Sequence, residues 1–449
     1  MCKDNKSFQS YLKKMFALSL IVSIGGVASS QENPSQDFYK SFNDSTLRLD
    51  YVFGGGPKGN QVFLNAQSKQ AGWAGRHTRL KDTPVKGNGN ILVLDPETGD
   101  TLYNYCFSSL FQEWIYTPEA ATTAQSFENS FVVPLPVKEA DIKLSLRNNK
   151  DQEIAGLTHR YRPDDVLVRN ITHTPLPHKY IHRGNDVDKA IDLAILAEGY
   201  TQDEMESFLE AADRIGNEIL NYEPFASRKD KFNIVAVMTP SEESGVSVPL
   251  KDQWVNTRYG SHYSTFYSGR YLTAPRVLQM HKDLEGIPYE AILVLVNTTE
   301  YGGGGMFNSY QIAAANNPLT PVVAVHEFGH SFGGLADEYN YGEDDDLTYA
   351  KGFEPWEPNI TTLVDFGSKW EDMVTPGTPV PTPWTEKPRE EYANFKIEDM
   401  PIGAYEGAGY RKTGIYRPSE TCRMRDNYFP SFCKVCEKSL LETIDFYTD

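Results

Sequence analysis

The residues best suited to chemistry lie in one short stretch, residues 322–339, which reads VVAVHEFGHSFGGLADEY. Within it, His326, Glu327 and His330 form the H-E-x-x-H pattern of zinc peptidases. Two histidines four residues apart lie on the same face of a helix, so both imidazoles can reach a single ion. Glu327 lies one step around the helix, where its carboxylate can take a proton from water without binding the metal. The stretch therefore predicts a catalytic metal site, and a buried helix with two hydrogen-bonded histidines is the structural alternative.

A catalytic zinc ion usually has three protein ligands and one open position, so a third ligand is needed. Gly333 and Gly334 can end the helix, because glycine readily adopts the left-handed conformation that turns the chain. Asp337 and Glu338 follow seven and eight residues after His330. A sharp turn at the glycines would bring one of these carboxylates back to the metal. We expect Asp337 to be the third ligand, with Glu338 as the alternative.

The elements that must position this helix are predicted from apolar runs. Residues 191–197, 233–238 and 291–296 read as buried strands, and a helix follows the first of them. That helix begins with the capping box Thr201 to Glu204 and continues with apolar residues at helical spacing. Strands that alternate with helices predict an α/β domain whose sheet supports the metal-binding helix.

The first part of the chain has a different pattern, with short runs of alternating apolar and polar residues. Examples are residues 46–53, 91–94 and 102–105, and the last two flank the turn sequence Asp95 to Asp100. Such spacing predicts an antiparallel β-sandwich. We therefore expect an α+β multidomain protein. The expected parts are a signal peptide (1–30), a β-sandwich domain (36–165), a linker (166–185) and an α/β catalytic domain (186–449).

Length bears on the number of domains, and charge bears on the possible binding partners. A chain of 449 residues exceeds what one core normally covers, which supports more than one domain. The formal net charge of −18 and the pI near 5.0 argue against nucleic acid or an anionic membrane as the partner. A protein or peptide substrate is compatible with this composition, and the sequence does not indicate an oligomeric state.

The N-terminus has the pattern of a secretory signal. Lys13 and Lys14 precede the apolar run 15–26, and small residues follow at 28–30. The run is too short for a transmembrane helix, and Cys2 lies before it, which does not suit lipid anchoring. We expect an exported protein in the periplasm, on the cell surface or outside the cell.

Three further features have more than one interpretation. Cys422, Cys433 and Cys436 suggest a local disulfide, with free thiols or a metal site as alternatives. The glycines at 302–305 let a backbone approach closely, either to an extended substrate or as a flexible loop. The acidic run 343–346 could bind Ca²⁺ or remain a solvated loop, and it lacks EF-hand spacing.

Taken together, these blocks resemble the immunoglobulin A peptidase type of secreted bacterial zinc metallopeptidases, a metzincin-like family. The resemblance rests on residues 193–201 (LAILAEGYT), on residues 326–339, and on residues 422–425 (CRMR) with 432–436 (FCKVC). It implies a metzincin-like catalytic domain after an N-terminal domain, with Met424 in a turn beneath the metal as a soft apolar floor.

The chain departs from the common metzincin spacing, which places the third ligand six residues after the second histidine. Here that residue is Ala336, so the ligand must shift to Asp337 or Glu338. The resemblance implies a zinc-dependent endopeptidase with Glu327 as general base, and immunoglobulin-type substrates by resemblance only. Tyrosines are candidates for stabilising the oxyanion, namely Tyr410, Tyr416 and Tyr428. The alternatives are a surface carbohydrate- or protein-binding protein with a vestigial peptidase domain, or a zinc amidase.

Overall fold

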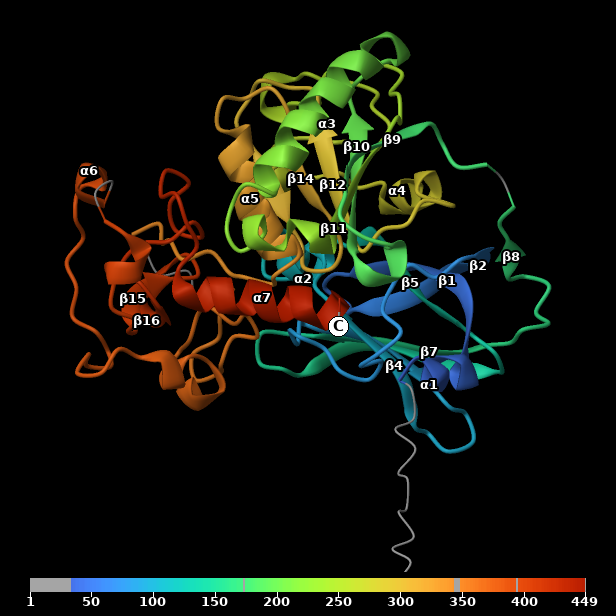
Figure 1. The fold of residues 1–449 in the computed structure, drawn as a ribbon, viewed down its shortest axis with the longest axis horizontal. Helices are drawn as coiled ribbons and strands as arrows, with labels where there is room; N and C mark the ends of the chain where they lie inside the picture. The colour runs from blue at the N-terminus through green and yellow to red at the C-terminus, as the bar shows by residue number, and fades with distance from the viewer. Residues whose placement is uncertain (1–33, 173, 343–347, 393–394, 449) are drawn as a thin grey trace, which may run out of the picture.

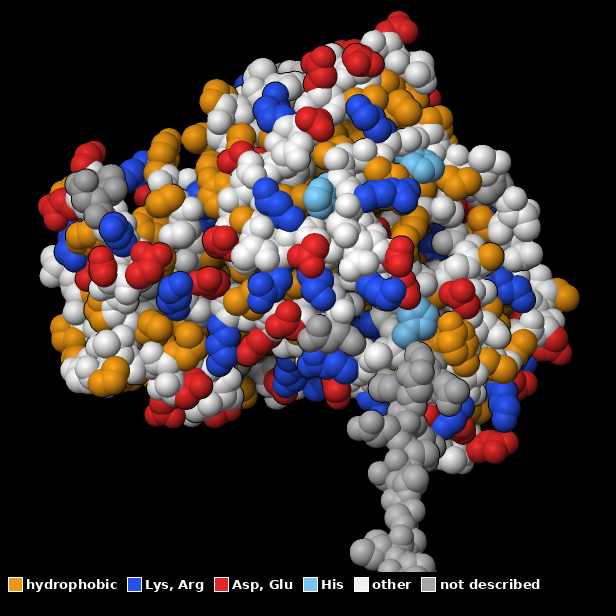
Figure 2. Space-filling view, viewed as in Figure 1, with side chains coloured by type: hydrophobic (Ala, Val, Ile, Leu, Met, Phe, Trp, Pro, Cys, Tyr) orange, Lys and Arg blue, Asp and Glu red, His pale blue; other side chains and the backbone are white. Residues whose placement is uncertain are grey.

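The computed structural model describes residues 34–172, 174–342, 348–392 and 395–448. The expected signal peptide and the acidic run 343–346 lie outside these residues. In the described part of the chain, no helix is both long enough and apolar enough to span a bilayer. On the face shown in Figure 2, acidic and basic side chains are interspersed over the surface.

The N-terminal part is built mostly from strands, in two four-stranded sheets that share one hydrophobic core. The first sheet has the order β5-β1-β2-β8 and the second has the order β4-β3-β6-β7. Their strands are β1 (Phe42–Gly55), β2 (Gln61–Ala71), β3 (Gly89–Leu94), β4 (Thr101–Phe107), β5 (Gln125–Pro136), β6 (Ala140–Arg147), β7 (Glu153–Tyr161) and β8 (Arg169–Asn170). The expected hairpin at residues 91–105 is confirmed as β3 and β4. Two short helices, α1 (Pro34–Ser41) and α2 (Leu110–Trp114), accompany the sheets.

The second part contains a six-stranded sheet in the order β13-β14-β12-β10-β11-β9. Its strands are β9 (His178–Arg183), β10 (Ile191–Glu198), β11 (Phe232–Val237), β12 (Ala291–Val296), β13 (Gly303–Gly305) and β14 (Gln311–Ala314). The four inner strands are parallel, and the two edge strands β9 and β13 run antiparallel to their neighbours. The predicted buried strands are therefore confirmed as β10, β11 and β12.

Helices cover both faces of this sheet, as a buried parallel sheet requires. On one face, α3 (Met205–Ile219) and α5 (Thr320–Ser331) share a core with β10 and with the C-terminal helix α7 (Lys434–Thr448). On the other face, α4 (Val277–Asp283) packs with the alternate residues of β10. The predicted capping box is present, with the backbone N–H of Thr201 donating to the Glu204 carboxylate at 2.8 Å.

The segment expected as a linker, residues 166–185, carries two short strands. β8 adds to the first sheet of the N-terminal part, whereas β9 pairs with β11 of the six-stranded sheet. β9 reads HKYIHR and is only half-buried, and so it lacks the apolar run by which the inner strands could be predicted.

The two parts are joined by buried polar contacts. The guanidinium of Arg48 in β1 contacts the Glu285 carboxylate at 2.7 Å, and both side chains are almost fully buried. Ser108 and Phe307 exchange hydrogen bonds of 2.9 Å in both directions. Figure 1 shows α7 crossing the molecule between the six-stranded sheet and the N-terminal sheets. It also shows the C-terminal segment that contains α6 (Arg389–Tyr392), β15 (Tyr405–Ala408) and β16 (Arg411–Arg417) extending to one side.

Candidate active site

The predicted metal-binding motif lies on α5. The helix begins at Thr320 with Pro321 in its first turn, where the missing N–H of proline costs no hydrogen bond. Its apolar side packs into the core, where the rings of Phe328 and Phe332 stack with centroids 4.9 Å apart. The helix ends as predicted near the glycine pair, because Gly334 has a φ of +61° and donates its N–H to the His330 carbonyl. The chain therefore reverses just after His330.

This turn brings one carboxylate to the two imidazoles. The Oδ1 atom of Asp337 lies 3.0 Å from His326 Nε2 and 3.3 Å from His330 Nε2. The two Nε2 atoms are 3.1 Å apart. The three atoms form a nearly equilateral triangle at the surface of a cavity. Glu338, by contrast, is fully buried and its carboxylate contacts Cys436 and Asn359.

The triangle has the dimensions of a tetrahedral metal site. Zinc binds imidazole nitrogen and carboxylate oxygen at about 2.0–2.1 Å, which places ligand atoms about 3.3 Å apart. The observed edges of 3.0–3.3 Å agree with this value. Glu327 also lies near the two histidines, with one carboxylate oxygen and one nitrogen of each imidazole within 4.8 Å of one another. Of these two carboxylates, that of Asp337 has distances to both Nε2 atoms that fall in the range of a tetrahedral site.

The second ring nitrogens show which atoms face the centre of the triangle. His326 Nδ1 lies 3.0 Å from the Arg423 carbonyl, and His330 Nδ1 lies 2.6 Å from the Leu335 carbonyl. A carbonyl only accepts, so each Nδ1 carries a proton and each Nε2 presents a lone pair. Two lone pairs and a carboxylate then converge on one point, which requires a proton or a cation there. The donor set therefore fits a divalent metal.

Charge effects support this arrangement. Burial alone would lower the pKa of His330, but the Asp337 carboxylate raises it to about 9 when no metal is bound. Burial alone would raise the pKa of Asp337, yet the two histidines hold it far below its usual value. The hydroxyl of Tyr410 donates to Asp337 Oδ2 at 2.6 Å, so the second carboxylate oxygen is also bonded. Asp337 is thus kept ionised and fixed in orientation.

Glu327 lies beside the triangle, where it also lines the cavity. Burial raises the pKa of its carboxyl group above the ordinary value, and the nearby histidines oppose that change. Gly303 in β13 lies against it, since a Cβ atom at Gly303 would stand 2.8 Å from Glu327 Oε1. This carboxylate can therefore accept a proton beside the donor triangle.

The glycines of β13 line the cavity and also lie close to neighbouring backbone. They form a short strand rather than a loop, and Tyr271 forms a parallel bridge with Gly303 on the outer side of that strand. A Cβ atom at Gly305 would meet the Glu327 carbonyl at 2.6 Å. The glycines are thus needed so that β13 can lie between α5 and the segment at Tyr271.

The donor triangle opens into a cavity of about 1480 Å³ whose walls come from both parts of the chain. The N-terminal part contributes Glu113 of α2, which accepts a hydrogen bond of 2.6 Å from the Tyr271 hydroxyl. Desolvation raises the pKa of Glu113 to about 7. The sequence analysis did not find Glu113 or Tyr271, because no local motif links two residues so far apart in the chain.

The three candidate tyrosines occupy different places. Tyr410 holds Asp337, and Tyr428 is exposed on the cavity wall. Tyr416 is not among the described residues that line the cavity. Met424 lies in a turn directly beneath α5, because its Sδ atom would stand 2.7 Å from a Cβ atom at Gly329. It is fully buried, as expected for an apolar floor.

Two protein-family models match the chain. One, described as IgA Peptidase M64, matches residues 181–400 and 389–444, and the other, described as Peptidase M64 N-terminus, matches residues 37–158. No curated protein matches the chain at a significant level. The matched ranges cover more than half of the 449 residues and include α5, the donor triangle and the turn at Met424. They confirm the resemblance, and with it a peptidase of a metal-dependent class. The chain belongs to the IgA Peptidase M64 family.

Proposed function

We propose that the protein is a zinc-dependent endopeptidase that hydrolyses peptide bonds in protein substrates. His326, His330 and Asp337 would hold the ion, and Glu327 would act as general base. The observation that carries the proposal is the triangle of donor atoms, 3.0–3.3 Å apart, whose lone pairs converge at the surface of a large cavity.

A bound zinc ion supplies Lewis-acid chemistry, polarising a carbonyl and lowering the pKa of water. Glu327 provides the proton transfer, since its carboxylate lines the same cavity next to the triangle. Its raised pKa brings it closer to working pH, which suits a group that first takes a proton from water and then gives it to the leaving amine. Tyr410 and the two backbone carbonyls keep the ligands oriented throughout.

The cavity supports a polypeptide substrate. Its volume of about 1480 Å³ exceeds the roughly 300–1,000 Å³ typical of small-molecule sites. Walls from both parts of the chain give room for residues on either side of the bond to be cleaved. Immunoglobulin-type substrates are suggested by the family description alone. Of the two candidate tyrosines that line the cavity, Tyr410 already donates its hydroxyl to Asp337, so we assign the oxyanion donor to Tyr428.

The remaining assignments are part of the same proposal. Residues 1–30 would be a signal peptide that exports the protein, 36–165 a β-sandwich domain, and 186–449 a metzincin-like catalytic domain. The parallel sheet, α5 and the turn of Met424 beneath it support the last assignment. The pairing of β8 with β2 and of β9 with β11 supports a division between the two domains within the linker proposed at 166–185.

Two variants of the mature protein test the mechanism together. Glu327→Ala should bind zinc as the wild type does but lose casein hydrolysis by a factor of about 10²–10⁴. His330→Ala should lose both the ion and the activity. Glu442→Ala, an exposed carboxylate on α7, is the matched control and should change neither. Full hydrolytic activity in Glu327→Ala would refute the assignment of the general base. Zinc bound without hydrolysis of any polypeptide would favour an amidase.

A further inference from the structure

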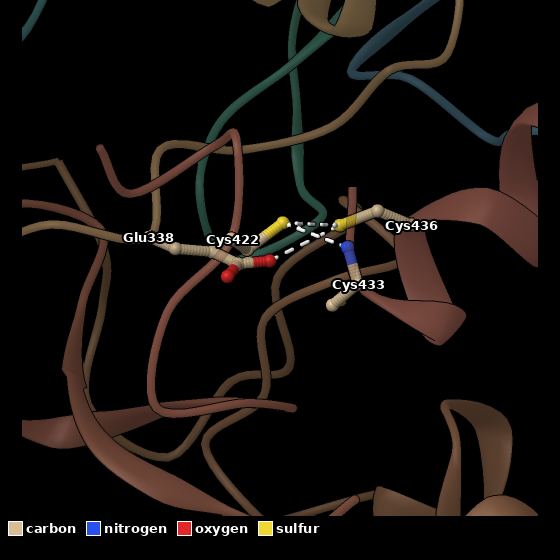
Figure 3. Close-up of side chains that lie close together, drawn as sticks. All are labelled: Glu338, Cys422, Cys433 and Cys436. Atoms are coloured by element: carbon tan, nitrogen blue, oxygen red, sulfur yellow. Dashed lines mark hydrogen bonds between the residues drawn. The ribbon is translucent and has the colours of Figure 1, made fainter. Parts of the chain in front are cut away.

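A second group of metal-ligating side chains lies behind the active site, where the mechanism above does not use it. It consists of Glu338, Cys422, Cys433 and Cys436. One ligand atom from each residue lies within 4.8 Å of the others, and all four residues are at most 2% exposed. Figure 3 shows the Glu338 carboxylate directed toward the sulfur atoms of Cys422 and Cys436. We call this group the Cys3Glu cluster.

We propose that the Cys3Glu cluster binds a second, structural zinc ion through three thiolates and one carboxylate oxygen. Zinc binds thiolate sulfur at about 2.3 Å, and tetrahedral geometry then separates two sulfur atoms by about 3.8 Å. The Sγ atoms of Cys422 and Cys436 are 3.8 Å apart. A carboxylate oxygen and a sulfur in such a site would be about 3.6 Å apart. The observed distance from Glu338 Oε1 to Cys436 Sγ is 3.1 Å, a few tenths of an ångström shorter.

The surroundings of Glu338 support a cation. Its Oε1 accepts a hydrogen bond from Asn359, but its Oε2 has no hydrogen-bond partner although it is buried. Among the residues described, no basic side chain forms an ion pair with Glu338. The nearby guanidinium of Arg417 donates instead to the backbone carbonyls of Glu406, Gly407 and Glu420. A fully buried carboxylate without a positive partner is costly, and a metal ion at the cluster would supply that partner.

The cysteines have the local geometry of thiolate ligands. Cys433 and Cys436 flank the start of α7, and the backbone N–H of Cys433 donates to Cys422 Sγ at 3.1 Å. Backbone donors at a helix N-terminus stabilise negative charge on sulfur. A disulfide would use only two of the three sulfurs, and the third thiol and Glu338 would remain buried. All three cysteines are free thiols in the structure.

The position of the cluster indicates what the ion would do. Glu338 directly follows the predicted ligand Asp337, and Cys422 directly precedes Arg423, whose carbonyl fixes His326. The backbone N–H of Glu338 also donates to the Met424 carbonyl at 2.8 Å. One ion at the Cys3Glu cluster would therefore link α7 and the turn at Met424 to the segment 326–338, which carries His326, His330 and Asp337. It would position these residues without touching substrate.

Measurements on the wild-type protein, purified without reductant, test the proposal without relying on any variant. Metal analysis should give two zinc ions per chain. After exchange with Co²⁺, the protein should show the intense near-ultraviolet band of thiolate-to-cobalt charge transfer, which a His-His-Asp site cannot produce. Titration of thiols in the denatured protein should find Cys422, Cys433 and Cys436 all reduced. A disulfide among them, or cobalt binding without the thiolate band, would overturn the proposal.

Variants then separate this site from the catalytic one. Cys433→Ser and Cys436→Ser should lose one ion and most of the cobalt–thiolate band, whereas Cys106→Ser, a buried thiol in β4, should keep both. His330→Ala should lose the other ion and retain the band in full. The two proposals can thus fail separately, since the band does not depend on peptidase activity. An unchanged band in both cysteine variants would refute the cluster as its source.

Discussion

The hydroxyl of Tyr410 offers a sharp test of how the proposed zinc ligands are held. It donates to Asp337 Oδ2 at 2.6 Å, and Tyr410→Phe removes this one bond while keeping the ring. The ring is retained by its neighbours, because it stacks on Tyr341 with centroids 5.6 Å apart and an interplanar angle of 6°. The substitution should therefore leave the fold intact and loosen only the carboxylate.

The size of the effect follows from the bond. A hydrogen bond to a charged group contributes about 1.5–3 kcal/mol, which corresponds to roughly 10- to 150-fold in an equilibrium constant. The metal-free protein also keeps this bond, since Asp337 is ionised there as well. Only part of the hydrogen-bond energy therefore differs between the zinc-bound and the zinc-free protein. We expect zinc affinity to fall by about tenfold, the lower end of the range of about 10- to 100-fold for residues that hydrogen-bond to metal ligands.

The assay is competition for zinc between the protein and a chromophoric chelator at fixed pH. Tyr341→Phe is the matched control, because its hydroxyl belongs to the same ring cluster but accepts a hydrogen bond from Arg270 instead. Tyr410→Phe should release zinc at about one-tenth of the chelator concentration that the control needs. Equal affinity in the two variants would show that Tyr410 does not hold the ligand.

Three further predictions concern other contacts. Gly303→Ala should reduce kcat at least tenfold without loss of zinc, because the added Cβ would stand 2.8 Å from Glu327 Oε1 and displace the carboxylate of the proposed general base. Loss of zinc from this variant would contradict the reasoning. Arg48→Met should lower the free energy of unfolding in urea by about 3 kcal/mol, because it removes a positive charge that neutralises buried carboxylates, including that of Glu285. An unchanged urea concentration at the unfolding midpoint would argue against a stabilising role for this contact. The raised pKa of His330 stabilises the metal-free protein fully below about pH 6.5, and this stabilisation is lost as pH rises through about 9. The Tm of chelator-treated protein should therefore fall between pH 7 and 9.5 more steeply than that of zinc-loaded protein. The same dependence of Tm on pH in both forms would refute the raised pKa of His330 as its cause.

The sequence allowed three of the four inner strands and the helix α5 to be predicted, because each has a strong local signal. β10, β11 and β12 are continuous apolar runs, and α5 carries a fixed histidine spacing. The turn at Gly334 was also predictable from glycine alone. The edge strands β9 and β13 were not predicted, since one is half-polar and the other is made only of glycine.

Features that depend on long-range packing could not be read from the sequence. Glu113 reaches the cavity only because α2 of the N-terminal part lies against the second part of the chain. The spacing after His330 left Asp337 and Glu338 as alternatives, and only the structure shows that the Asp337 carboxylate lies at the two imidazoles whereas that of Glu338 contacts Cys436 and Asn359. Likewise, Cys433-x-x-Cys436 has no second cysteine pair, so the fourth member of the cluster, a glutamate almost 100 residues earlier, gave no sequence signal.

The most direct test of the central claim is a zinc titration of peptidase activity. The purified protein is treated with chelator until casein hydrolysis stops, and zinc is then added back in fractions of one equivalent. If His326, His330 and Asp337 hold the catalytic ion, activity should return as zinc is added and level off by two equivalents, because the Cys3Glu cluster takes up the other ion, and His330→Ala should show no recovery. Casein hydrolysis that persists after zinc has been removed from the triangle would contradict the account.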